Sequence, residues 1–198
     1  MEMFRYLLAG SFLFLIQASL VAADGANSEL RSLLVSATEA MQREQLQEAE
    51  RLFEEARERY PDSRDARFGL GTLYIKQGNY AAAIDIMQGL KRDFPGQFPI
   101  INNLAWLYAT ATDHSVRDGA RAIALAQEAL LLQPNNYHVW STLSEGHYVV
   151  GDYERALRTA REALRLSREA DAPADRIRDY QEQVEKSRRA AEAMTILE

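Results

Sequence analysis

One pattern constrains this chain more than any other: the same small side chains and prolines return at a nearly fixed interval along the sequence. The interval is 34 residues, and it stretches once to 39, with the extra residues between Ala105 and Ala122. The markers are an alanine at Ala49, Ala83, Ala122 and Ala156, a second small residue at Ala37, Gly71, Ala105 and Ser144, and a proline at Pro61, Pro95 and Pro134. Three independent markers with one period predict a structural unit that repeats about four times.

The repeated unit is best seen in residues 64–95. Apolar residues recur three or four positions apart on both sides of Gly78-Asn79, which predicts two helices. Gly78 suits the left-handed residue that follows a helix, and Asn79 suits the N-cap of the next one. Gly71 and Ala83 on the facing stripes would let two antiparallel helices approach closely, and Pro95 ends the second helix. Such a pair cannot bury its apolar faces alone, so it needs neighbouring pairs.

This pattern resembles the tetratricopeptide repeat (TPR) family, whose signature is W-x-x-L-G-x-x-Y followed by A-x-x-x-F, A and P. Each copy meets the signature in part, and the second copy does so with Leu70, Gly71, Tyr74 and Pro95. The resemblance implies an all-α fold, a right-handed α-solenoid of about four TPR helix pairs. The TPR domain would span 24–172, with repeats at about 30–63, 64–97, 98–136 and 137–170.

The charged segment 173–198 is expected to form a C-terminal capping helix that shields the last repeat from water. Its apolar stripe consists of Ile177, Tyr180, Val184 and Ala191. This stripe is predicted to pack against the fourth repeat.

Residues 1–23 carry a different signal. Arg5 precedes an apolar run from Tyr6 to Val21, and Val21-Ala22-Ala23 offers the small residues that a signal peptidase reads. We therefore expect a secretory signal peptide that is cleaved after Ala23, which would make the protein periplasmic or secreted. The alternative is an uncleaved helix that anchors the chain to the inner membrane, although the run is short of the roughly 20 apolar residues of a membrane span.

Composition argues against several classes of function. The net charge of −6 argues against general nucleic-acid binding, and the absence of cysteine removes disulfides, thiolate zinc sites and cysteine nucleophiles. No two of His114, His138 and His147 are spaced as a helical zinc pair, and no phosphate-binding or nucleophile motif is present. We therefore predict no enzymatic activity, metal, cofactor or small-molecule substrate. His147 is expected to pack in the core, and His114 and His138 to lie at the surface.

The resemblance implies a function in protein binding. In TPR proteins, the first helix of each pair lines a concave groove that holds a peptide or helix of another protein. The matching positions here are Leu34, Met41, Phe68, Thr72, Ile75, Lys76, Asn102, Trp106, Ser141, Glu145 and Tyr148. Phe68, Trp106 and Tyr148 are expected to be aromatic anchors. Lys76 is the one basic residue among them, which argues against a clamp for a carboxylate.

Three alternatives stay open at this point. The chain's own C-terminal helix could fill the groove, or the protein could be a structural one that forms oligomers by stacking end to end. The extra residues in the third repeat, Thr112 to Gly119, could form a loop that contacts a partner or could only lengthen the turn.

Overall fold

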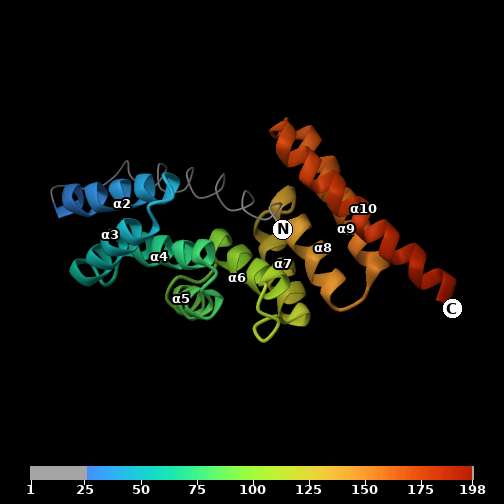
Figure 1. Ribbon diagram of the computed structural model, residues 1–198, viewed down its shortest axis with the longest axis horizontal. Coiled ribbons are helices and arrows are strands. Elements are labelled where there is room, and N and C mark those ends of the chain that lie inside the picture. Colours follow the sequence, from blue (N-terminus) through green and yellow to red (C-terminus); the bar gives the residue numbers. More distant parts are fainter. Residues whose placement is uncertain (1–25, 198) are drawn as a thin grey trace. The chain divides into compact units, whose positions relative to one another are not determined.

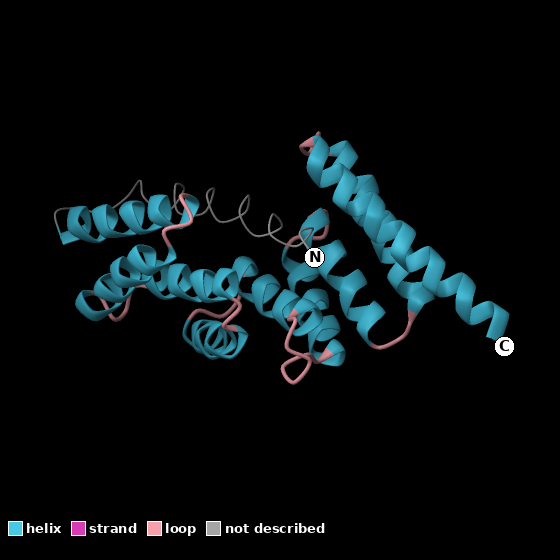
Figure 2. Ribbon diagram, viewed as in Figure 1, coloured by secondary structure: helices cyan, strands magenta, loops and turns pink. Residues whose placement is uncertain are grey.

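The computed structural model describes residues 26–197, so the predicted signal peptide at residues 1–23 lies outside the described part of the chain. Within residues 26–197 the chain forms nine α-helices and no strand, which confirms the predicted all-α class (Figures 1 and 2). Eight of the helices form four consecutive pairs, followed by a single C-terminal helix. The pairs are α2 (Ala26–Gln42) with α3 (Leu46–Arg59), α4 (Arg64–Gln77) with α5 (Tyr80–Asp93), α6 (Phe98–Thr110) with α7 (Gly119–Leu132), and α8 (Tyr137–Val149) with α9 (Tyr153–Glu169), and the last helix is α10 (Ala174–Leu197).

The described helices divide into two compact units, with the boundary between Pro95 and Gly96. The first unit holds α2 to α5 and the second holds α6 to α10. Each unit buries its own set of the repeated small residues. Those in the first are Ala37, Ala49, Gly71 and Ala83, and those in the second are Ala105, Ala122, Ser144 and Ala156.

The turn between α4 and α5 follows the prediction from sequence. Gly78 has φ 77° and lies in the left-handed region, where a residue with a Cβ would be strained. The Asn79 side chain accepts a hydrogen bond from the Ala82 backbone N–H at 3.4 Å and so caps α5. The two helices therefore reverse direction as Gly78-Asn79 predicts.

Two glycines of α4 permit close helix contacts in the first unit. A Cβ added at Gly71 would lie 2.9 Å from Met87 Cε, which agrees with the predicted close approach of α4 and α5. A Cβ added at Gly69 would lie only 2.2 Å from Cε1 of Phe53, a fully buried residue of α3. The contact at Gly69 was not predicted, because it joins two neighbouring repeats and no local pattern marks it.

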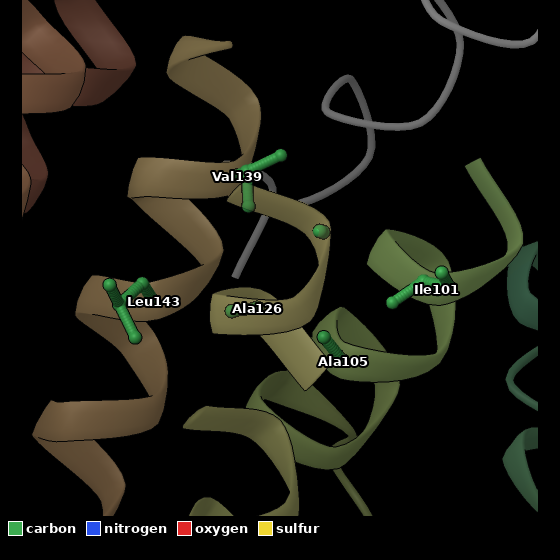
Figure 3. Close-up of a cluster of buried hydrophobic side chains, with 6 residues drawn as sticks. Ile101, Ala105, Ala126, Val139 and Leu143 are labelled. Atoms are coloured by element: carbon green, nitrogen blue, oxygen red, sulfur yellow. The ribbon is translucent and has the colours of Figure 1, made fainter. Parts of the chain in front are cut away.

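The core of the second unit lies where α6, α7 and α8 meet (Figure 3). Ile101 and Ala105 of α6 face Ala126 of α7 and Val139 and Leu143 of α8, and all five side chains are buried. Alanines at the closest points let larger side chains pack between the helices.

The extra residues of the third repeat form the connection between α6 and α7, shown among the pink loops in Figure 2. Its base is fixed, because Arg117 Nε donates to the Ala111 carbonyl at 2.5 Å and the Asp118 side chain caps α7 by accepting from the Arg121 N–H at 2.9 Å. Residues 112–115 are exposed. A partner-contacting role for this loop stays a prediction.

The C-terminal helix α10 packs alongside α9 and also contacts α8 (Figure 1). Its buried stripe agrees with the predicted apolar one at Tyr180 and Ala191 alone. The buried side chains are Arg176, Tyr180, Gln183, Ser187 and Ala191, whereas Ile177 and Val184 are only half-buried. The helix is therefore rotated so that mainly polar side chains face the fourth repeat.

Candidate partner-binding surfaces

The predicted groove residues all lie on the first helices of the pairs, α2, α4, α6 and α8. Their direction follows from helix geometry. Trp106, for example, comes one residue after Ala105, so it is turned by about 100° from the face that packs against α7 and α8. The described chain forms two units, and each carries part of these positions, α2 and α4 in the first and α6 and α8 in the second.

In the first unit, the groove positions of α2 and α4 form a largely buried apolar face. Its buried members are Leu34, Met41, Phe68, Thr72 and Ile75. The Thr72 hydroxyl donates within its own helix, to the Phe68 carbonyl at 2.9 Å. Lys76 is exposed at the end of this face and forms an ion pair with Glu44 at 2.8 Å. Since Glu44 already neutralises this lysine, the face holds no cation prepared for a carboxylate.

In the second unit, α6 presents two polar groups that have no hydrogen-bond partner. They are the indole N–H of Trp106 and the side-chain oxygen of Asn102, one helical turn apart, and both atoms are shielded from water. Trp106 itself is 8% exposed. A buried donor or acceptor without a partner costs about 1–3 kcal/mol, so such atoms are uncommon in folded proteins. Here one donor and one acceptor, from residues one helical turn apart on the predicted binding face, are both without a partner.

The groove positions of α8 are occupied by α10. The Gln183 amide nitrogen donates to the Ser141 carbonyl and to Glu145 Oε1, while Ser141 Oγ donates to Gln183 Oε1. Lys186 donates to Glu145 Oε2 at 2.9 Å, and its Nζ lies 4.0 Å from the centre of the Tyr148 ring. Sequence reasoning placed the three α8 residues on the inner face but missed Gln183 and Lys186. The one feature of the sequence that pointed to a polar contact here is the small number of apolar residues in the C-terminal helix.

The prediction that His138 lies at the surface is wrong. Its ring is half-buried at the start of α8, and Nδ1 forms a 2.8 Å hydrogen bond with the hydroxyl of Tyr180 from α10. Burial, together with the nearby charge of Arg176, lowers the pKa of His138 to about 4. Burial also raises the pKa of Tyr180. The partner of His138 lies 42 residues away in sequence, so no local pattern could reveal the contact.

The other two histidines lie as expected. His147 is buried within the fourth repeat, and His114 is exposed in the loop between α6 and α7. Among the residues that the structure describes, no three His, Asp or Glu side chains gather where they could hold a metal ion. In the same part of the chain, no helix is both long and apolar enough to cross a membrane.

A shallow hollow of about 580 Å³ lies at the turn between α3 and α4 and includes Tyr60, Arg64 and Phe94. Both arginines of the hollow are already paired with carboxylates. Arg59 pairs with Glu29 and Glu55, and Arg64 pairs with Asp65 at 2.8 Å. The hollow therefore offers neither an unpaired arginine nor an enclosed space for a ligand.

Comparisons with known proteins agree with the helix pairing. Residues 34–98 match the profile of a family described as tetratricopeptide repeat. No curated protein matches the chain.

Several solved structures share the fold. MamA from Desulfovibrio magneticus aligns with a TM-score of 0.62 at 11% identity, over 83% of this chain and 96% of its own. A thermophilic TPR protein from Thermus thermophilus aligns with a TM-score of 0.59 at 17% identity, over 84% of this chain and 99% of its own. The TPR2B domain of yeast Sti1, solved in a complex with pHsp70, gives 0.53 and 18%, over 60% of this chain and 90% of its own. At these identities the similarity shows the α-solenoid fold alone.

Proposed function

Because this chain is a tetratricopeptide repeat protein, we propose that it is a non-catalytic scaffold outside the cytoplasm that binds a peptide or helix of another protein. TPR proteins commonly mediate protein–protein interactions. The partner would bind on the inner faces of the first helices of the pairs. The Sti1 domain in its pHsp70 complex supports it by analogy, as a similar fold that holds a protein ligand.

The observation that carries the proposal is the unpaired donor and acceptor on α6. A peptide group of a partner would supply both missing partners, because its carbonyl can accept from Trp106 Nε1 and its N–H can donate to Asn102 Oδ1. Pairing them would recover part of the free energy that the isolated protein loses by burying them alone. Since Trp106 is mostly covered, binding on this face would also displace the side chains that cover the indole.

Trp106→Phe tests this proposal more cleanly than truncation to alanine. The substitution keeps an aromatic ring but removes the N–H, whereas alanine would also open a cavity. A photoreactive residue at the exposed Lys76 would capture partners in cells for identification by mass spectrometry. We expect Trp106→Phe to weaken binding of the captured partner by about fivefold, since one lost hydrogen bond costs about 1 kcal/mol.

The matched control is Trp140→Phe, because the Trp140 N–H is already bonded to the Pro134 carbonyl at 2.7 Å. The control should leave partner binding unchanged. Equal binding by the wild type and Trp106→Phe would refute the assignment of the α6 face.

The extracytoplasmic location is supported by the sequence of residues 1–23 alone. N-terminal sequencing of the exported protein should begin at Asp24. Full-length chain recovered from the membrane fraction would instead support the anchored alternative.

A further inference from the structure

The contact face of α10 is unusual for a helix that covers an apolar repeat. Of its five buried side chains, Arg176, Gln183 and Ser187 are polar, and Tyr180 turns its hydroxyl to His138. Only Ala191 is fully apolar. Among the buried side chains of α10, Tyr180 and Ala191 therefore bury most of the apolar area.

Two groups on this face lower the stability of the docked state. Arg176 Nη1 and Ser187 Oγ are buried without a hydrogen-bond partner. Each such group has given up its hydrogen bonds to water without gaining one in the protein. The satisfied polar contacts with α8 oppose this cost, beside the packing of α10 against α9.

Those contacts are concentrated at Gln183 and Lys186, which lie one turn apart on α10. Gln183 makes three hydrogen bonds with α8, at 2.9 Å from Ser141 Oγ, 3.0 Å to the Ser141 carbonyl and 2.9 Å to Glu145 Oε1. Lys186 completes the pairing of the Glu145 carboxylate and stacks its charge on the Tyr148 ring. We call this set of contacts the Gln–Lys clasp.

The chemistry of the clasp defines what α8 recognises. Glu145 is 8% exposed, so it is costly to leave without a cation, and Tyr148 favours a cation at the same place. Ser141 offers both a hydroxyl donor and a backbone acceptor, which a primary amide satisfies together. The face therefore selects a helix with an amide and a lysine three residues apart, and it would reject an acidic helix.

We propose that the inner face of α8 is a recognition site for such a helix, which α10 occupies within the same chain and which a partner helix with the same Gln–Lys pair takes by displacing α10. This proposal rests on the proposed function and names the chemistry of its partner. It assigns the fourth repeat a basic, amide-bearing helical ligand.

The test uses the full-length chain and a fluorescent synthetic peptide of residues 174–197 as the probe. Lys186→Glu in the protein places a carboxylate against Glu145, which should release α10 and expose the site. We expect this variant to bind the native peptide at least tenfold more tightly than the wild type, in which α10 competes. A peptide with Gln183→Ala should bind the same variant at least tenfold more weakly than the native peptide.

Docking of α10 can be followed separately with spin labels, because the chain has no cysteine of its own. Labels at Arg161→Cys on α9 and Gln181→Cys on α10, both exposed positions, report the distance between the two helices. The distance distribution should broaden in Lys186→Glu and return to that of the wild type in the double variant Glu145→Lys/Lys186→Glu. Recovery in the double variant would also show that Lys186→Glu does not act by unfolding the protein.

The results separate this proposal from the one before it. An unchanged distance distribution in Lys186→Glu, or equal binding of the native and altered peptides, would overturn the recognition site on α8. Exchange of α10 between two copies, seen as a dimer by sedimentation, would overturn the assignment to a partner protein. Loss of partner binding in Trp106→Phe is measured independently and concerns α6 alone.

Discussion

The two tryptophans of the chain differ in the hydrogen bonding of the indole N–H. Trp140 Nε1 donates to the Pro134 carbonyl, while Trp106 Nε1 is buried without a partner. Trp140→Phe should therefore lower the free energy of unfolding of the isolated protein by about 1 kcal/mol, whereas Trp106→Phe should leave it unchanged or raise it. Urea unfolding of both variants followed by circular dichroism gives the comparison. A larger loss for Trp106→Phe than for Trp140→Phe would show that the Trp106 N–H has a partner in solution.

Glycines in α4 and α5 lead to a second prediction. Gly69→Ala should destabilise the protein by about 1–3 kcal/mol, because the new methyl group would overlap the buried ring of Phe53. Gly71→Ala should cost less, since the methyl end of Met87 can rotate away. Gly89→Ala is the control: its nearest neighbour is the flexible end of Arg67, and alanine favours the helix by up to about 1 kcal/mol. Thermal midpoints in the order Gly89→Ala, Gly71→Ala, Gly69→Ala, from highest to lowest, are expected.

At the scale of elements, the junction between α8 and α10 should respond to pH through His138. The groups that face its ring are Tyr180 and Arg176 from α10 and Tyr137 beside it. Its pKa is about 4 in the folded protein and about 6.5 in the unfolded chain, so the unfolded state binds more protons between these values. Stability is therefore complete above pH 6.5 and falls as the pH drops toward 4, by at most about 3 kcal/mol.

The free energy of unfolding, measured from pH 7 to pH 4, checks whether stability falls as the pH drops. His138→Gln should flatten the profile, and His114→Gln, at an exposed position, should leave the wild-type slope. The stability of His138→Gln should still depend on pH to some extent, because burial also lowers the pKa of His147. Identical profiles for the wild type and His138→Gln would contradict the buried, neutral state of His138.

Elements also show what the sequence could predict. The turn at Gly78-Asn79 and the small residues of each pair obey local rules, and the structure follows them. The orientation of α10 does not, because it depends on hydrogen bonds between residues about 40 positions apart. The inner-face positions of α8 could be assigned from the repeat. The residues of α10 that bind them, Gln183 and Lys186, could not, because a helical stripe with few apolar residues does not show which helix it packs against.

At the scale of the whole molecule, stability should be a sum over local contacts. Gly69 meets Phe53 in the first unit, and Gly146 meets Ile123 and Ala122 in the second, so the two sites share no neighbour. The effects of Gly69→Ala and Gly146→Ala on the free energy of unfolding should add to within about 0.5 kcal/mol in the double variant. A larger deviation in urea unfolding would show energetic coupling between the units.

The short connection between α9 and α10, residues 170–173, has a consequence for any competing ligand. A helix tethered so closely acts on its site at an effective concentration of roughly 1 mM or more. A partner at about 1 μM must then bind α8 about a thousandfold more tightly than α10 does to displace half of it. The tether thus sets a minimum for the concentration and affinity of a competing helix. A helix below this minimum leaves α10 docked, and one that is abundant or binds tightly displaces it.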